Sequence, residues 1–403
     1  MLTHLKYLLI LISLVSFGAS SVMAQATFAE LQQVLQQKAS FAAADFAALQ
    51  HQQTVVRLAP VSDKGEIAVT GLINIRGSAE AFLRSYLDGM TQKNNAAILE
   101  IGSFAKQPAL ADLQNLTIES QDIEALRECV LGDCPVKLSA RMIERFHKEI
   151  NWQAPDYQLN AANLFKQMLV DYVRDYRARG ESALMEYNDK LDGTSLAAGQ
   201  RAITAEPSYI NDILTDKKPG LRLIEDAIVW SKIKFGLKPV ITINHITVYQ
   251  RPGDAGPQVL VSAKQIYATH YFNASQSLTA FVSVPAVGNY LVYENRSRAD
   301  GLEGPLGKFK RRIVEKKVLE ALRNILEQSK ISIDGPALTA TGLEFSSHTP
   351  YDWRYRLFGG IRPLLWLLML SALITLLVLG RRRVDTETAE RRNKALKPES
   401  AKS

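Results

Sequence analysis

The segment Val240-Ile-Thr-Ile-Asn-His-Ile-Thr-Val-Tyr-Gln250 decides the fold class of this chain, together with Gln258-Val-Leu-Val-Ser-Ala-Lys-Gln-Ile-Tyr-Ala-Thr-His-Tyr-Phe272 behind it. Both segments are rich in β-branched and aromatic residues, which favour strands. The residues between them, Arg251-Pro-Gly-Asp-Ala-Gly-Pro257, are typical of a turn. Two strands joined by so short a connection pair antiparallel.

The same pattern continues on both sides, so we predict an antiparallel meander over residues 223–294. A long helix is predicted to follow, from about residue 305 to residue 329, and its apolar stripe must be buried against the sheet. The stripe consists of Val314, Val318, Ala321, Leu322 and Ile325. The predicted fold class is therefore α+β, with an antiparallel sheet and a long C-terminal packing helix. This helix is the last element of the predicted domain and ends at residue 329.

The chain before the meander alternates between predicted helices and strands. Ser78 suits a helix N-cap, and apolar residues follow it at helical spacing, so a helix is expected to begin there. Residues 138–190 predict a helical insertion, and residues 191–220 are rich in Gly, Ser, Thr and Pro, which predicts a loop. The other expected elements are a helix at 27–51 and strands at 54–60, 66–76, 96–104 and 115–127.

The N-terminus predicts export. Lys6 precedes an apolar run from Tyr7 to Gly18, and Val22-Met-Ala24 fits the small-x-small rule of signal peptidase. We therefore expect residues 1–24 to be a cleaved signal peptide. An uncleaved N-terminal anchor is the alternative, but the apolar run is shorter than the roughly 20 residues of a membrane helix.

Near the other end, residues 361–380 predict a single transmembrane helix. No charge occurs from Leu364 to Gly380, and three consecutive arginines follow. This is the positive-inside pattern of a helix whose C-terminal end faces the cytoplasm; a buried core helix is the alternative. The expected organisation is an extracytoplasmic domain at 25–330, a linker at 331–360 and a basic cytoplasmic tail at 381–403.

The basic character of the chain is concentrated in that tail. The formal net charge is +7, and residues 381–403 hold eight Lys and Arg against four Asp and Glu, a net +4. With Lys6 and Arg362 also set aside, the rest of the chain carries about +1. The charge therefore indicates topology and gives no support to nucleic-acid binding.

The chain has two cysteines, Cys129 and Cys134, in Glu128-Cys-Val-Leu-Gly-Asp-Cys-Pro135. In an oxidising compartment, such a pair with a Gly-Asp turn between its members predicts a small disulfide loop. A redox dithiol is the alternative, although the spacing is not CxxC. Zinc needs four ligands, and no second Cys/His pair stands at metal spacing, so we expect neither a metal nor a cofactor.

Two stretches carry a resemblance to a known family. In Ile73-Asn-Ile-Arg-Gly-Ser-Ala-Glu-Ala-Phe-Leu-Arg84 a strand ends at a small polar residue and a helix begins, and Asn289-Tyr-Leu-Val-Tyr-Glu-Asn-Arg-Ser-Arg298 precedes the last helix. In this order of elements the chain resembles START and polyketide-cyclase-like domains, which have the helix-grip fold. The insertion 138–190 departs from the family because it interrupts the sheet.

The resemblance implies a curved sheet that grips the long helix, with an apolar cavity between them for a lipid or another hydrophobic ligand. Alternating strand residues are expected to face that space, either as cavity lining or as ordinary core. They are Ile266, Ala268, His270, Phe272, Leu278, Ala280, Val282, Leu291 and Tyr293. The candidate ligand-binding residues are His245, His270, Phe272, Leu291 and Tyr293.

The chain lacks the GxSxG, HExxH, GxxxxGK[ST] and GxGxxG signatures of common enzymes and nucleotide sites. His245 and His270 lie in predicted strands. On neighbouring strands and one face they would share a metal, an acid/base role or the polar head of a ligand. Ordinary hydrogen bonds beside the sheet are the alternative.

A basic cluster, Lys308, Lys310, Arg311 and Arg312, stands at the start of the last predicted helix. It predicts contact with anionic lipid headgroups or an acidic partner, and a solvated helix face is the alternative.

Three classes of function follow from the sequence. The favoured one is a membrane-anchored extracytoplasmic protein that binds a lipid or other hydrophobic ligand. The alternatives are an interaction module for another envelope protein, through residues 138–190, and an enzyme with an unrecognised site near His245 and His270. The expected location is a bacterial inner membrane, single-pass, with the large domain in the periplasm and the tail in the cytoplasm.

Overall fold

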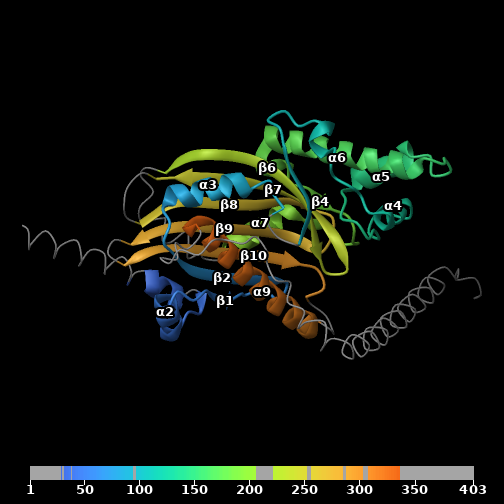
Figure 1. The fold of residues 1–403 in the computed structure, drawn as a ribbon. Coiled ribbons are helices and arrows are strands. Elements are labelled where there is room, and N and C mark those ends of the chain that lie inside the picture. The colour runs from blue at the N-terminus through green and yellow to red at the C-terminus, as the bar shows by residue number, and fades with distance from the viewer. Residues whose placement is uncertain are drawn as a thin grey trace, which may run out of the picture. The chain divides into compact units, whose positions relative to one another are not determined.

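The computed structural model of the chain describes residues 29–335, apart from residues 30, 38, 94–96, 206–220, 252–255, 285–286 and 303–306. The chain divides into two units, residues 1–337 and 338–403, and all described residues belong to the first. The described fold is α+β, with one large antiparallel sheet and helices packed on it (Figure 1).

Eight strands form the large sheet, in the order β1-β2-β10-β9-β8-β7-β6-β3. The region predicted as a meander holds five consecutive strands, each paired antiparallel with the next. The N-terminal strands extend the meander at both edges, since β2 lies beside β10 and β3 lies beside β6. The strands are β1 (Val55–Ala59), β2 (Glu66–Ile75), β3 (Ile98–Phe104), β6 (Arg222–Phe235), β7 (Lys238–Gln250), β8 (Gly256–Ala268), β9 (Phe272–Val284) and β10 (Gly288–Ala299).

Two helices, α3 (Ala79–Gly89) and α9 (Gly307–Asp334), cover one face of the sheet, which we call the α9 face (Figure 1). The helix α3 begins at Ser78, whose Oγ accepts a hydrogen bond from the Ala81 amide at 3.2 Å. Its Phe82 ring stacks on Phe281 of β9, with the ring centroids 5.8 Å apart. Aromatic stacking therefore ties α3 to the middle of the sheet.

The long helix α9 lies close to β2. A Cβ atom at Gly71 would meet the side chains of Leu322 and Leu326, so only glycine leaves room for both. At the other end of the helix, Asp334 accepts hydrogen bonds from the amides of Arg76 and Gly77, at 2.7 and 3.0 Å. The helix is thus held along the whole of β2.

The opposite face of the sheet carries two groups of helices. Residues 31–37 and α2 (Ala43–Gln50) pack against β1, β2, β9 and β10, where Leu72, Val292 and Ala280 are buried. The other group is a helical block that packs against β6, β7 and β8. Its elements are η1 (Leu110–Leu113), α4 (Ser120–Arg127), α5 (Ala140–Glu149), α6 (Tyr157–Arg179), η2 (Gly180–Ala183), β4 (Glu186–Tyr187), β5 (Thr194–Ser195) and α7 (Leu196–Ala205).

Three local predictions are wrong. Residues 115–127 contain the helix α4 in place of a strand, because Ile123 and Leu126 have helical spacing and are both buried. Residues 191–220 include the strand β5 and the alanine-rich helix α7 where a loop was expected. The expected helix at 27–51 is interrupted at Ser40, whose φ is 58°. The left-handed backbone at that residue ends one helix before α2 starts.

The predicted fold class included one C-terminal transmembrane helix, and this prediction requires a correction. None of the helices among the described residues combines enough length with enough apolarity to cross a lipid bilayer. The longest, α9, has a narrow apolar stripe that packs on the sheet and many charged residues elsewhere. The segment 361–380, on which the prediction rested, lies outside the described residues, as do residues 1–24 and 381–403.

Candidate functional site

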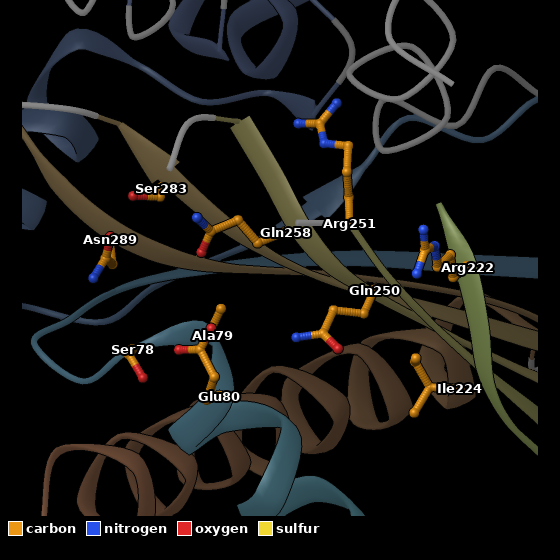
Figure 2. A pocket seen from close by; sticks show the side chains of 10 residues that line it. All are labelled: Ser78, Ala79, Glu80, Arg222, Ile224, Gln250, Arg251, Gln258, Ser283 and Asn289. Carbon is orange, nitrogen blue, oxygen red and sulfur yellow. The ribbon is translucent and has the colours of Figure 1, made fainter. Parts of the chain in front are cut away.

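A cavity of about 550 Å³ opens at one end of the sheet, between the start of α3 and the ends of five strands. Figure 2 shows the side chains around this opening. Its volume falls in the range of small-molecule sites, about 300–1,000 Å³. We call it the strand-end pocket, and it is lined by Ser78, Ala79, Glu80, Arg222, Ile224, Gln250, Arg251, Gln258, Ser283 and Asn289.

Two β-bulges shape the strand-end pocket. The pairing of β6 with β7 shifts between Leu223 and Glu225, which leaves Ile224 as the extra residue. The pairing of β8 with β9 shifts between Pro257 and Val259, which leaves Gln258 as the extra residue. Both extra residues line the pocket. Bulges re-aim side chains at the ends of strands, and here they turn one apolar and one amide side chain toward the same space.

The charged groups of the pocket are two arginines and one glutamate. Arg222 is opposite Gln250 in the register of β6 and β7, and Arg251 is the next residue after β7. The Ser78 side chain and the Glu80 backbone amide lower the pKa of Glu80, so this carboxylate is ionised at the helix N-terminus. Guanidinium groups bind carboxylate or phosphate oxygens through paired N–H donors, and two arginines against one glutamate leave the pocket with a net positive charge, which favours an anionic ligand.

Behind the pocket, aromatic side chains pack between α3 and the sheet. The rings of Phe82 and Tyr86 lie 6.0 Å apart, and Phe82 also stacks on Phe281. Burial raises the pKa of Tyr86 and of Tyr293, which contributes to the same core. These contacts make the region between α3 and β9 part of the hydrophobic core.

A second cavity, of about 620 Å³, lies between α2, β1 and α9. Its arginines are occupied within the fold. Arg323 donates to the Thr54 carbonyl, and Arg57 pairs with the buried carboxylate of Asp45. Because these cations hold secondary-structure elements together, we assign this cavity a structural role.

His245 lies on β7 and points away from the α9 face. Its Nδ1 atom is 3.0 Å from the Tyr176 hydroxyl of α6, and its Nε2 atom is 3.3 Å from Asp226 Oδ1. Burial raises the pKa of Tyr176 to about 12, so this phenol stays protonated at neutral pH. The group joins α6 to the sheet, and it does not border either cavity.

His270 follows β8 and is buried in the helical block. Its Nε2 atom is 3.0 Å from Asp122 Oδ2 of α4, and its Nδ1 atom is 3.0 Å from the Pro135 carbonyl oxygen. The structure does not bring His245 and His270 together, because His245 is opposite Lys264 within β8, whereas His270 lies beyond the end of that strand. Among the residues that the structure describes, no group of three or more His, Cys, Asp and Glu side chains could hold a metal ion.

The other candidate ligand-binding residues are also dispersed. Phe272 starts β9 and its ring lies 4.8 Å from that of Phe235. Leu291 and Tyr293 face α3 and α9 in the core, whereas Leu278 packs on the opposite face. The expectation that the alternating residues share one face is therefore wrong. Successive side chains alternate between the two faces of the sheet within one strand. Bulges and strand pairing decide which of the two alternating sets faces α9 in each strand.

The remaining predicted site residues are two buried cysteines and a cluster of cations at the start of α9. Cys129 and Cys134 are joined by a disulfide, with their Cα atoms 4.5 Å apart. In the basic cluster, Arg311 donates to the carbonyls of Lys64 and Glu66, at 2.6 and 2.7 Å. Its other members, Lys308, Lys310 and Arg312, are exposed.

Sequence reasoning did not identify the residues of the strand-end pocket. Arg251 begins the segment whose composition predicts a turn, and Arg222 precedes the predicted meander. Arg222 and Arg251 stand at neighbouring ends of two consecutive strands of the meander. Two arginines placed in this way are a sequence signal for an anion-binding site. A scan of the chain against protein-family models finds no match, and a search of curated proteins also finds none.

Proposed function

We propose that this protein binds a small amphipathic anion in the strand-end pocket. The ligand has a carboxylate or phosphate group and an apolar part, which makes it a lipid-like molecule. The observation that carries the proposal is the meeting of Arg222 and Arg251 with the bulge residues Ile224 and Gln258 around one cavity.

The polar lining suits the anionic group. Two guanidinium groups supply charge, and the amide side chains of Gln250 and Gln258 line the same cavity. A hydrogen bond to a charged group contributes about 1.5–3 kcal/mol when it is well shielded, and less in an open pocket. We therefore expect each arginine to change the affinity by roughly tenfold.

The rim of the pocket suits the apolar part. Ile224 lines the cavity, and it is exposed together with its neighbour Leu223. Val287, in the turn between β9 and β10, is a further exposed apolar residue close to Ser283 and Asn289 in the sequence. The resemblance to helix-grip domains implies a ligand between the sheet and the long helix. The proposal instead places the ligand at the strand ends, because the strand-end pocket holds the two arginines and aromatic rings pack between α3 and the sheet.

Titration calorimetry with the full chain tests the proposal. The probes are laurate and dodecyl phosphate, compared with dodecanol, which lacks charge, and with inorganic phosphate, which lacks the chain. We expect binding of the two amphipathic anions, roughly tenfold weaker in Arg222→Gln and in Ile224→Asp. The matched control is Arg141→Gln, a single charge removal on α5 far from the pocket in the fold.

Two results would count against this function. Equal binding of dodecanol and laurate would show that charge recognition is absent. Unchanged affinity in both Arg222→Gln and Arg251→Gln, with thermal unfolding like that of the unmodified chain, would place the ligand elsewhere.

A specific observation favours a second candidate, an interaction module for another protein. The disulfide loop exposes Leu131 at 61%, and Leu191 in the turn between β4 and β5 is exposed at 91%. These two turns adjoin, since Asp133 pairs with Lys190 and the Gly132 amide donates to the Asn188 carbonyl at 2.9 Å. A disulfide holds this apolar projection in one shape, which lowers the entropic cost of inserting it into a partner pocket.

Crosslinking tests the second candidate. A photoreactive residue at position 131 in the full chain should crosslink to a defined protein in cells, and the crosslink should disappear in Leu191→Asp. The same residue at position 141 is the control. Crosslinks of equal intensity from both positions would contradict a specific interface.

We further propose that the described domain functions outside the cytoplasm, as the predicted signal peptide 1–24 suggests. The Cys129–Cys134 disulfide supports this location, because structural disulfides persist in oxidising compartments. Thiol alkylation in intact cells, followed by mass measurement, should leave both cysteines unmodified. Complete alkylation without added reductant would contradict it.

A further inference from the structure

The first half of α9 presents an apolar centre to solvent. Phe309 is 58% exposed and Ile313 is 43% exposed. Residues four apart in a helix lie on one face, so the two side chains are neighbours. They point away from the stripe of Leu322 and Leu326 that packs on β2. Large exposed apolar side chains side by side on a helix mark a surface for contact.

Cations flank this apolar centre on both sides. At 100° per residue, Lys310 and Lys317 lie on one side of Phe309 and Ile313, and Arg312 and Lys316 lie on the other. All four are exposed. Lys316 also lies 3.9 Å from Glu320, an exposed pair that contributes little. We call these six residues the α9 outer face.

The charge of this segment is strongly one-sided. Residues 308–317 hold six Lys and Arg and a single acidic residue, Glu315. Glu315 is already paired with Arg311 at 3.1 Å, and Arg311 is fixed to β2 through backbone carbonyls. Of the other five cations, Lys316 keeps only its exposed contact with Glu320, and all five are exposed on the described surface, where they can face an external negative surface.

We propose that the α9 outer face binds the surface of an anionic lipid bilayer. An interfacial helix has apolar residues that enter the boundary of the acyl chains and basic residues that contact phosphate groups, and this face has both. Each cation near an anionic surface strengthens binding by about fivefold, so four act together as a strong but reversible contact. A duplex nucleic acid presents phosphates but no apolar layer for the aliphatic side chain of Ile313, so only the cations of this face would contact it.

The experiment uses the full chain with an environment-sensitive fluorophore attached to a cysteine at position 310 or 313, in separate samples. Vesicles of phosphatidylcholine are compared with vesicles that also contain phosphatidylglycerol. We expect a blue shift and higher intensity at position 313 with the anionic vesicles, and a salt-dependent affinity. Because the fluorophore reports only its own surroundings, contacts made by other parts of the chain do not produce the signal.

Charge reversal of Lys310, Arg312 and Lys316 to Glu should weaken the contact at least a hundredfold. The matched control reverses three exposed cations on α5 and α6, Arg141, Lys148 and Arg179, and should bind like the unmodified chain. Thermal unfolding confirms that both variants are folded. The proposal is overturned by equal signals on neutral and anionic vesicles, by binding that survives the α9 reversal, or by an equal signal from polyglutamate without vesicles. The last result would identify an acidic protein surface as the partner.

Discussion

Replacing His270 and Asp122, singly and together, tests the buried contact that joins the helical block to the sheet. His270 Nε2 lies 3.0 Å from Asp122 Oδ2, and its Nδ1 lies 3.0 Å from the Pro135 carbonyl oxygen. Lys238 Nζ lies 2.9 Å from the second Asp122 oxygen. The side chains of His270 and Asp122 are both buried, so water cannot easily replace either one.

The expected loss in the free energy of unfolding follows from the hydrogen-bonding groups that each substitution leaves without a partner. In His270→Ala, one Asp122 oxygen and the Pro135 carbonyl lose their hydrogen bonds, and each unsatisfied group costs about 1–3 kcal/mol. Two such groups together cost about 2–6 kcal/mol. We expect each single substitution to lower the free energy of unfolding by about 4 kcal/mol. The double variant should lose about 2 kcal/mol less than the sum, because the two side chains touch.

Urea unfolding of the full chain, followed by circular dichroism, gives the four free energies of unfolding. The control cycle uses His245 and Asp226, whose atoms are 3.3 Å apart but whose carboxylate is half exposed. Its coupling should stay below about 1 kcal/mol. Additivity within about 0.5 kcal/mol for His270→Ala and Asp122→Ala would refute the reasoning, because groups that share a buried contact cannot act independently.

Three further predictions concern stability. Burial raises the pKa of Asp122, but hydrogen bonds from His270 and Lys238 outweigh burial and hold the pKa below the usual 3.8. The ionised Asp122 therefore stabilises the fold above pH 3.8, and this stabilisation is lost as the pH falls below that value. Urea midpoints against pH should show this loss, and Asp122→Asn should remove that part of the dependence. In Gly77→Ala the new Cβ would lie 2.5 Å from the Ile333 carbonyl oxygen and 2.8 Å from its Cγ2, so thermal unfolding should show a loss of about 1–3 kcal/mol. Replacing both cysteines by alanine should cost about 2 kcal/mol in urea unfolding, because the closed loop spans only five residue steps; no loss would mean that the short loop keeps its shape without the bond.

Local patterns in the sequence predicted the regular elements well. The strand expected at 240–250 is β7, Lys238–Gln250, and the helix expected to begin at Ser78 is α3, Ala79–Gly89. Both depend on short-range preferences: β-branched residues for the strand, and a repeated apolar spacing for the helix. The same preferences failed at residues 115–127, where a β-rich start leads into the helix α4. When a short segment contains both β-favouring residues and a helical apolar spacing, the core on which it packs decides its secondary structure.

The pocket could not be predicted in this way, because it depends on registers between strands that are distant in sequence. Ile224 and Gln258 face the cavity only because each is the extra residue of a bulge. A shift of one residue moves a side chain to the other face of a sheet. The same applies to the histidines. A further bulge between Ile243 and Asn244 changes the pairing of β7 with β8, so alternation in the two strands does not relate His245 to His270.

The two proposed surfaces lie at opposite ends of one strand, so they can be tested independently. The strand-end pocket includes Asn289, which pairs with Ile75 at the end of β2. The α9 outer face begins beside Arg311, which is bonded to the carbonyl of Glu66 at the start of β2. A ten-residue strand separates these points by roughly 30 Å, about three Debye lengths at ordinary ionic strength. Reversing charges on α9 should therefore leave the affinity for laurate unchanged, whereas a large effect would mean that the ligand reaches its pocket through the membrane-facing helix.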